Sequence, residues 1–240
     1  MIDIHTHIVP CVDDGSDSLN GTISQVFYAK NQGVTDVFAT PHSEAFFQNS
    51  DVVFRDFYRM KTVLQGIFPE LNFYLGCEVM CAKRDMPDIL AYLSNKRLPS
   101  MNGTRYVLAE FSPWISPEDA NFCLSELQQA GWIPIIAHME RYVYLRRMAY
   151  IHDIRQSGCL IQVNVYSLEE YGEENVRDWA RSLIREKLVD FLGTDTHRSY
   201  YRPPSIEQGM NWLQQNCSKR YLEAISFQNA SRLLINDTDS

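Results

Sequence analysis

The sequence predicts an α/β protein, an incomplete seven-stranded (β/α)7 TIM-like barrel with its active site at the C-terminal ends of the strands. Seven short apolar segments alternate with helical segments at intervals of roughly 25 to 35 residues, which is typical of parallel βαβ units. Six of the seven predicted strands end in His, Asp or Glu, and the sixth carries Asn164 near its end. Because the C-terminal ends of barrel strands meet on one face, we expect these polar residues to share one site.

Each strand is predicted from an apolar run bounded by turn residues. Near-continuous apolar runs such as IPIIA fit strands that are covered on both faces. The predicted strands are Ile2–Ile4, Val34–Thr40, Phe73–Glu78, Tyr106–Glu110, Ile133–His138, Leu160–Val165 and Val189–Gly193.

Helices fill the intervals between these strands, and capping residues indicate their ends. Asp17 or Ser18 can cap a helix that runs to Gln32 and stops at Gly33. The other predicted helices are Asp51–Phe68, Arg84–Asn95, a segment from Ser116 or Pro117 to Gly131, Arg146–Gln156, a segment through Trp179 to Lys187, and two or three helices after Ile206.

Length and composition fit one domain. The 240 residues are 45% apolar, and no linker, repeat or low-complexity run divides them, so we expect a single domain over residues 1–240 with a frayed tail at 236–240. The net charge of −8 argues against a nucleic-acid partner, which would require a basic surface. Part of this acidity is expected to be metal-binding carboxylate.

The chain is predicted to be cytoplasmic. Its six cysteines have no paired CxxC spacing, which favours reduced, mostly buried thiols over a disulfide framework. No segment fits a signal peptide, and no apolar run approaches the roughly 20 residues that a membrane span needs. We therefore expect no membrane insertion.

The first fifteen residues, MIDIHTHIVPCVDDG, carry the strongest local signal. His5 and His7 follow a short strand, and residues two apart in an extended chain point to the same side. Two converging imidazoles are typical of a metal site, and Asp13 and Asp14 add oxygen donors in the turn that Gly15 closes. Taken alone, this pattern could equally be two surface histidines before an ordinary Asp-Gly turn.

Other strand ends repeat the pattern, and together they supply more ligands than one metal needs. A tetrahedral site takes about four ligands, so nine candidates suggest two or three metals with bridging carboxylates. Mixed nitrogen and oxygen donors suit Mn, Fe, Zn or Mg, and such metals lower the pKa of bound water. The nine candidate ligands are His5, His7, Asp14, His42, Glu78, Glu110, His138, Asp195 and His197.

Six ordered segments carry a resemblance to a known family. DIHTHIVPCVDDG, ATPH, GCEV, LAEF, AHMERY and GTDTH resemble, in order and spacing, the motifs of the PHP (polymerase and histidinol phosphatase) superfamily. Within it, the chain is most similar to the bacterial tyrosine-protein phosphatases of capsule and exopolysaccharide operons, the CpsB/YwqE type. The resemblance covers essentially the whole chain.

The resemblance implies a PHP fold, which is a distorted seven-stranded barrel, and a centre of three divalent metals, most often Mn, with Fe, Zn, Co or Mg as alternatives. It implies hydrolysis of phosphotyrosine, with an autophosphorylated bacterial tyrosine kinase tail as the partner. The family's ligand positions fall on the nine candidates, with Glu78 as the bridging carboxylate. The arginine of the family's His-Pro-Glu-Arg-Tyr motif falls on Arg141, which would bind phosphate. Arg141, Asp14 and His138 are the candidate catalytic residues.

The sequence departs from the family pattern at two positions. Ser43 stands where the family often has a second histidine, and Met139 replaces a proline. Neither change removes a candidate ligand, so we expect activity with altered local loop geometry. Tyr200 and Tyr201 follow His197 and are expected near the mouth of the site.

Three alternatives to a tyrosine phosphatase remain open at this point. The same site could serve histidinol phosphate or another small phosphate ester. An amidohydrolase also begins with His-x-His, but that class usually needs a carboxylated Lys where this chain offers Glu78. A non-catalytic metal-binding regulator would be marked by a missing ligand. Cysteine-based phosphatase chemistry is excluded because no Cys is followed six residues later by Arg.

Overall fold

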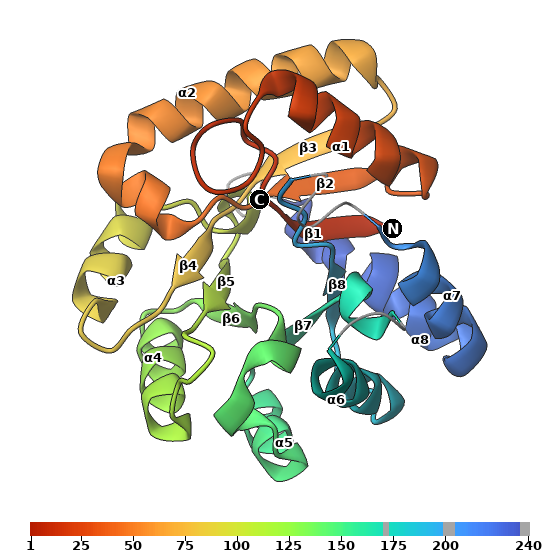
Figure 1. Ribbon diagram of the computed structural model, residues 1–240. Coiled ribbons are helices and arrows are strands. Elements are labelled where there is room, and N and C mark those ends of the chain that lie inside the picture. The colour runs from red at the N-terminus through yellow and green to blue at the C-terminus, as the bar shows by residue number, and fades with distance from the viewer. Residues whose placement is uncertain (170–172, 199–204, 236–240) are drawn as a thin grey trace.

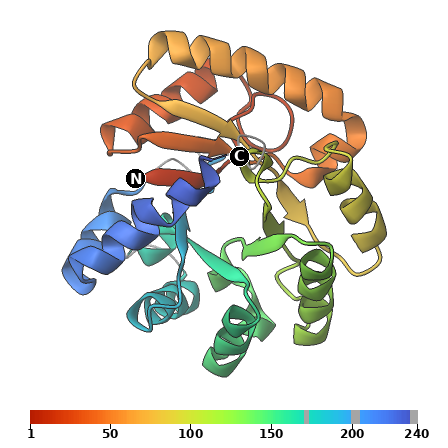
Figure 2. The same ribbon diagram turned by 180° about the vertical axis from the view of Figure 1, so that it is seen from behind.

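The computed structural model describes residues 1–169, 173–198 and 205–235. Strands lie in the middle and helices surround them, as Figure 1 shows from one side and Figure 2 from behind. The predicted tail at 236–240 and the predictions for Tyr200 and Tyr201 lie outside the described residues. Among the described helices, none combines the length and apolar character that crossing a bilayer requires.

The strands form two parallel sheets, of three and five strands, in the orders β1-β2-β3 and β4-β5-β6-β7-β8. The sheets meet at two seams: one joins β1 to the segment after β8, where the His7 N–H donates to the Thr196 carbonyl at 2.9 Å. The other is the bridge between His42 and Glu78. The strands are β1 Ile2–Thr6, β2 Asp36–Ala39, β3 Asn72–Leu75, β4 Glu78–Met80, β5 Tyr106–Glu110, β6 Ile133–Ile136, β7 Leu160–Asn164 and β8 Phe191–Gly193.

The α/β class and the parallel pairing are confirmed, but the count of seven strands is not. The third predicted strand is split: β3 pairs with β2 and ends at Leu75, whereas β4 pairs with β5 and begins at Glu78. The break falls at Gly76, where an added Cβ would lie only 2.7 Å from the Met101 sulfur. The described strands therefore form two adjoining sheets rather than one continuous seven-stranded ring.

The helices agree with the predictions except in one case. The second begins at Ser43 rather than Asp51, because two helical segments join across a kink at Asn49, whose φ is −162°. The Asn49 side chain accepts from the Val52 N–H at 3.3 Å, which caps the second segment and produces the helix-start signal that the sequence showed. The helices are α1 Leu19–Asn31, α2 Ser43–Ile67, α3 Met86–Ser94, α4 Pro117–Gln129, α5 Met148–Gln156, α6 Glu174–Arg185, α7 Glu207–Asn216 and α8 Lys219–Glu223.

On one face of the strands, the side chains are apolar along the strands and polar at the C-terminal ends. We call these two regions the apolar floor and the polar mouth. On β5, Tyr106, Leu108 and Glu110 share a face because side chains alternate along a strand. On β8 and just beyond it, Phe191 is followed two residues at a time by Gly193 and Asp195. The apolar members pack into one buried cluster, which holds Ile2, Ile4, Phe38, Met101, Leu108, Ile135, Ala137, Phe191, Ala230 and Leu233. The packing of this apolar floor holds the C-terminal strand ends, which carry the polar side chains, in place.

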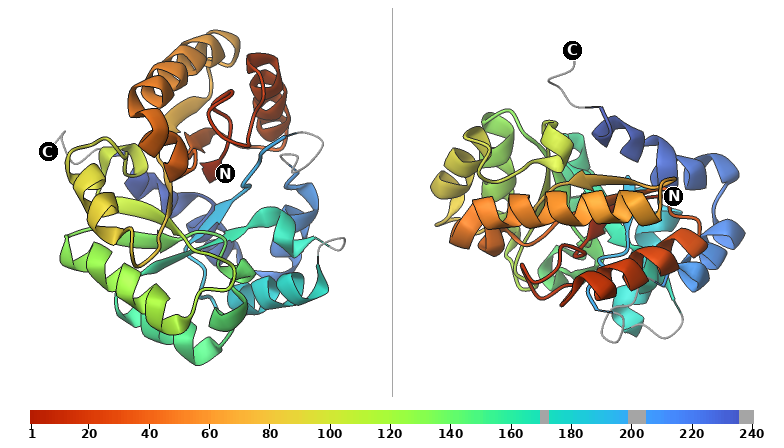
Figure 3. Two further views of the ribbon diagram at one scale, coloured as in Figure 1. Left: turned by 60° about the vertical axis from the view of Figure 1, so that its left-hand side comes forward. Right: turned by 90° about the horizontal axis from the view of Figure 1, so that it is seen from above.

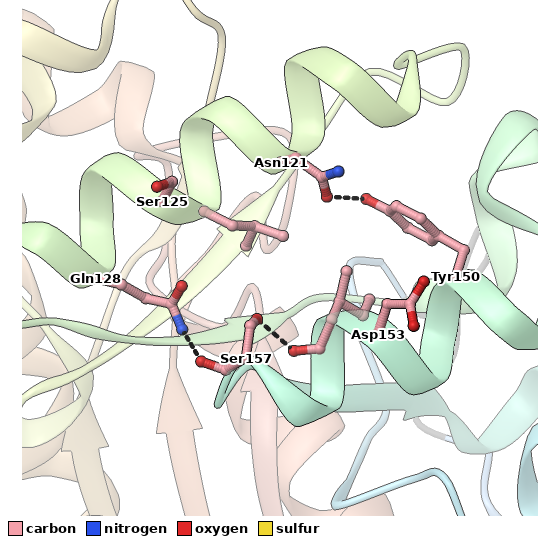
Figure 4. A pocket seen from close by; sticks show the side chains of 8 residues that line it. Asn121, Ser125, Gln128, Tyr150, Asp153 and Ser157 are labelled. Carbon is pink, nitrogen blue, oxygen red and sulfur yellow. Dashed lines mark hydrogen bonds between the residues drawn. The ribbon is translucent and has the colours of Figure 1, made fainter.

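A larger apolar cluster packs the helices against the outer faces of the strands. The two further views in Figure 3 show the helices spread around the strand layer. Helices α4 and α5 are also tied directly: the Tyr150 hydroxyl donates to Asn121 at 3.0 Å, and the Gln128 amide donates to the Ser157 carbonyl at 2.6 Å (Figure 4). These polar groups line the pocket shown in Figure 4 and bond to each other, so we interpret the pocket as a gap between two packed helices.

We expect Leu108→Ala to lower the free energy of unfolding by about 2–5 kcal/mol, since it removes a fully buried side chain from the apolar floor. Leu19→Ala is the matched control, because Leu19 is exposed at the start of α1. Urea unfolding of both variants measures the difference. Equal midpoints would contradict the assignment of the floor as a packed core.

Candidate metal centre

The first strand delivers two imidazoles to one point. The register between β1 and β2 advances three residues on β1, from Asp3 to Thr6, against two on β2, so β1 contains one extra residue. Such a bulge redirects the side chains beside it. The Nε2 atoms of His5 and His7 lie 3.2 Å apart, and both imidazoles are fully buried. The predicted convergence of these two residues is therefore confirmed.

Glu78 lies at the centre of the cluster, where β4 begins. Its Oε2 is 3.1 Å from Nε2 of both His5 and His7 and 3.2 Å from His42 Nδ1. Its Oε1 is 2.7 Å from His138 Nε2. One carboxylate thus contacts four imidazoles, which is the position a bridging ligand would need.

Asp195 closes the cluster from the end of β8. Its Oδ1 lies 3.4 Å from His7 Nε2 and 3.4 Å from His197 Nδ1. Its Oδ2 accepts from Arg141 at 2.6 Å and from the Asn164 amide at 3.1 Å. Asp195 therefore has one oxygen toward the imidazoles and the other held by side chains.

The adjacent aspartates 13 and 14 take different positions. Asp14 is 64% exposed, and its Oδ1 lies 3.4 Å from His42 Nε2 and 3.3 Å from His197 Nε2. The Asp13 side chain is only 5% exposed, and its Oδ2 lies 2.8 Å from His7 Nδ1, the ring nitrogen that faces away from Glu78. The geometry thus agrees with the choice of Asp14 as the candidate ligand, and it gives Asp13 the orienting contact that ligating imidazoles commonly have.

Three groups of ligand atoms are compact enough for a metal ion, with all atoms of each group within 4.8 Å of one another. His138 stands beside them, 3.5 Å from Glu110 Oε1 as well as in contact with Glu78. The structure thus brings together all nine residues that the sequence singled out. The groups are His7, Asp14, His42 and His197; His5, His7, Glu78 and Asp195; and His42, Glu78 and Glu110.

These residues fit divalent cations on two grounds. Glu110 Oε2 and His138 Nδ1 are buried without a hydrogen-bond partner among the described residues, and such atoms are costly unless something satisfies them. The donor set is imidazole and carboxylate without thiolate, which suits Mn, Fe, Zn or Mg. A cation would also reduce the repulsion between the clustered carboxylates.

Without metal, the carboxylates shift the imidazole pKa values upward. Burial opposes the charged form of His7, but the adjacent Asp13 outweighs it and raises the pKa of His7 well above its usual value. Burial also opposes the charge on His42 and His138. The nearby Glu110 carboxylate nevertheless raises the pKa of His42 to about 8 and, with Glu78, that of His138 to about 9.

The carboxylates shift in the opposite direction. Burial alone would raise the pKa of Glu78, but the surrounding imidazoles, His5 first, lower it well below its usual value. Burial likewise opposes the charge of Asp195, and the Arg141 guanidinium overcomes it and lowers that pKa. Without metal, the negative charges of Glu78 and Asp195 are therefore balanced by Arg141 and by the imidazoles with raised pKa values, and metal ions can supply this positive charge instead.

Two side chains of β7 support the cluster, and the sequence reasoning missed one of them. Gln162 Oε1 lies 3.2 Å from His5 Nδ1 and accepts from the His138 N–H at 2.7 Å. Its amide donates at 2.7 Å to Asn164, which donates to Asp195. The sequence signal for this role is that Gln162 and Asn164 are polar, two positions apart, in an otherwise apolar strand. Asp3, by contrast, accepts from the backbone of His5 and from Thr194.

Two cavities open beside Glu110. One, of about 380 Å³, is lined by Asp14 and His42 among others. The other, of about 410 Å³, is lined by Glu110, Phe111, Pro113, His138, Arg141, Tyr142 and Tyr166, and is called the Arg141 pocket below. Arg141 is 22% exposed there, between Asp195 and the Tyr166 hydroxyl. This pocket places a guanidinium and the half-buried Tyr166 ring next to the cluster, whereas Phe111 and Tyr142 are almost fully buried behind its surface.

The two departures from the family pattern have structural roles. Ser43 is buried at the start of α2, and its hydroxyl accepts from the Met80 N–H at 3.1 Å. Met139 is fully buried in a short 3-10 turn that directly follows His138. Neither residue takes a position among the candidate ligands.

Gly15→Ala is expected to weaken metal binding about 10- to 100-fold, the range seen when a ligand loses its orienting partner. An added Cβ would lie 2.2 Å from the His7 carbonyl oxygen and 2.9 Å from Asp13 Oδ1, so both residues must move. Gly66→Ala is the control, since a Cβ there meets nothing within 4 Å. Metal titration of the two variants gives the comparison. Unchanged affinity in Gly15→Ala would show that the His7–Asp13 contact does not support binding.

Metal binding at pH 7 should release protons, because His42 and His138 carry raised pKa values of about 8 and 9 and ligation requires neutral imidazole. The release should diminish as pH rises through these values. The same shifts stabilise the metal-free protein fully below the ordinary pKa of about 6.5, and that contribution is lost as pH rises through 8 and 9. Calorimetric titration in buffers of different ionisation enthalpy counts the protons. Binding without proton release would contradict the electrostatic description.

Comparison with known proteins identifies relatives along the whole chain. The chain is 30% identical over 244 residues to the tyrosine-protein phosphatase CpsB of Streptococcus agalactiae, covering 98% of this chain and 99% of the relative. It is 28% identical to the tyrosine-protein phosphatase YwqE of Bacillus subtilis, covering 99% of this chain and 93% of the relative.

Solved structures agree with these relatives. A crystal structure from work on YwqE of Bacillus subtilis and CpsB of Streptococcus pneumoniae, described as metal-dependent tyrosine phosphatases, matches with a TM-score of 0.85 and 26% identity. That match covers 98% of this chain and 95% of the other. A lactonase from Listeria monocytogenes, at TM-score 0.64 and 11% identity, shares the fold alone.

A family model described as capsular polysaccharide synthesis, CpsB/CapC, matches residues 1–235. This range contains all nine clustered residues, from His5 to His197. The chain belongs to the CpsB/CapC family of capsular polysaccharide synthesis proteins.

Proposed function

We propose that this protein is a metal-dependent protein-tyrosine phosphatase, a phosphoric monoester hydrolase. The Arg141 pocket carries the proposal, because it sets a guanidinium and the half-buried Tyr166 ring directly beside the imidazole–carboxylate cluster. A phosphotyrosine has the two matching parts, a phosphate and a phenyl ring. The relatives named tyrosine-protein phosphatase support the same activity.

The nine clustered residues would hold the metal ions, with Glu78 bridging them. We assign three divalent cations per chain, with Mn first and Fe, Zn, Co or Mg as alternatives that the nitrogen and oxygen donors also suit. Divalent cations in such a site supply Lewis acidity and lower the pKa of bound water. Gln162 and Asp13 hold the ligating imidazoles in orientation.

The chain's own residues position the substrate. Arg141 binds phosphoryl oxygens with its planar guanidinium, which matches phosphate geometry. Tyr166, whose ring lies beside Arg141, lines the pocket that receives the phenyl ring. His138 lines the same pocket, and Asp14, exposed at the mouth, is the group we assign to accept a proton from the attacking water. The tyrosyl oxygen is the leaving group.

The physiological substrate in this proposal is the autophosphorylated tail of a bacterial tyrosine kinase that controls capsule or exopolysaccharide synthesis. We place the reaction in the cytoplasm. We also propose that residues 1–240 act as one domain, in which β3 and β4 together take the place of one strand of a distorted seven-stranded PHP-type barrel. The match to the family over residues 1–235 supports this arrangement.

The alternatives differ in their substrate or in whether the protein catalyses a reaction at all. A small phosphate ester such as histidinol phosphate would use the same cluster but would not need an aromatic ring such as Tyr166 beside it. Amidohydrolase-type neighbours share only the fold, at 12% identity. A non-catalytic regulator is disfavoured because no candidate ligand is missing from the cluster.

The protein should release phosphate from a phosphotyrosine peptide much faster than from a phosphoserine peptide or histidinol phosphate, and a chelator should abolish the release. Loss of a ligand should cost about 100-fold or more in turnover, since outer contacts alone cost 10- to 100-fold. The variants are His138→Ala and Glu110→Gln.

The matched controls are His152→Ala and Glu186→Gln, because both residues are exposed and lie outside the cluster. These controls should keep wild-type turnover. Faster hydrolysis of histidinol phosphate than of phosphotyrosine would transfer the proposal to small esters. Chelator-resistant hydrolysis would contradict metal dependence.

A further inference from the structure

An exposed apolar patch borders the Arg141 pocket. Trp114 is 64% exposed, Tyr144 55% and Val143 37%, and these three residues are called the aromatic shelf. Buried faces usually take side chains of this size, and exposed clusters of them commonly mark binding surfaces. Trp and Tyr are also the residues most enriched where binding energy concentrates. The exposed apolar surface of the shelf therefore indicates a binding surface.

The shelf is continuous with the pocket through the backbone. Trp114 directly follows Pro113, and Val143 directly follows Tyr142, and both Pro113 and Tyr142 line the pocket. The Val143 N–H donates to the Pro113 carbonyl at 3.0 Å, so the two loops are joined. A molecule that fills the pocket and extends outward in this direction meets the shelf next.

The two aromatic rings are held together and both remain accessible. The ring centroids of Trp114 and Tyr144 are 6.0 Å apart, with 59° between their planes. Beneath them, the Tyr142 hydroxyl accepts from the Phe111 N–H at 3.1 Å, which anchors the second loop to the end of β5. Trp and Tyr side chains have only two torsion angles, so they lose little conformational entropy when a ligand binds.

The loops come from the catalytic side of the molecule. One follows β5 after Glu110 and the other follows β6 after His138, so both leave strands at the ends that carry the cluster. Tyr58 on α2 is also exposed, at 58%, but it lines a different cavity of about 620 Å³, together with Phe57 and Tyr74. Its place outside the Arg141 pocket distinguishes Tyr58 from the shelf.

We propose that the aromatic shelf is a binding subsite for an apolar side chain of the substrate peptide, close in sequence to the phosphotyrosine. This inference rests on the proposed function and narrows its substrate class to peptide segments rather than free phosphate esters. The peptide residues next to a phosphotyrosine extend beyond the pocket by about 3.3–3.6 Å each, which a small ester cannot do.

The test compares free phosphotyrosine, an all-polar phosphotyrosine peptide, and a series of such peptides with one Phe at each of three positions on either side of the phosphotyrosine. In the wild type, one or two Phe positions should raise kcat/KM over the all-polar peptide, mainly through KM. Trp114→Ala and Tyr144→Ala should lower the ratio of peptide to free phosphotyrosine kcat/KM about 10-fold, a loss of about 1.4 kcal/mol. Trp114→Phe should recover most of it.

Tyr58→Ala is the control, matched in exposure to Tyr144, and should leave the ratio as in the wild type. An unchanged ratio in both shelf variants, or no dependence on Phe position, would overturn the subsite while leaving the phosphatase intact. An equal loss on both substrates would also overturn it, since the shelf would then only support the pocket wall. A wild type that hydrolyses neither substrate would overturn the proposed function itself.

Discussion

The site depends on burying several carboxylates and imidazoles within contact distance of one another. Glu78 alone touches four imidazoles, and the Nε2 atoms of His5 and His7 face each other at 3.2 Å. Such a set is costly in a folded interior unless cations or protons separate its lone pairs and charges. In the metal-free protein, protons on the imidazoles separate these groups, as the raised pKa values of His42 and His138 indicate. Metal ions can take the place of those protons.

The backbone adapts to hold this cluster. His138 and Asp195 adopt left-handed φ values of 29° and 51°, which non-glycine residues rarely take and which cost about 1–3 kcal/mol each. Hydrogen bonds from elsewhere hold both residues: the His138 N–H donates to Gln162, and the Asp195 N–H donates to the His5 carbonyl at 2.8 Å. The apolar floor beneath, with Leu108 at its centre, keeps these strand ends in place.

Features that depend on nearby residues were predictable from the sequence. A cap at Asp17 or Ser18 and the convergence of His5 and His7 follow from local rules, and the structure has the cap at Ser18 and the convergence. Features that depend on contacts across the fold were not. The change of partner strand at Gly76 depends on the approach of Met101, and the support of His5 by Gln162 joins residues 157 positions apart. A single sequence shows the type of these residues but not which distant group they meet.

The central claim is that the nine clustered residues bind catalytic metal ions, and diffraction from crystals grown with Mn²⁺ tests it most directly. Anomalous difference maps recorded at the manganese absorption edge should show three peaks among the imidazole nitrogens and carboxylate oxygens around Glu78. Their coordination distances should be about 2.0–2.2 Å. The absence of peaks in crystals of protein that still hydrolyses phosphotyrosine, or peaks only at other surfaces, would contradict the claim.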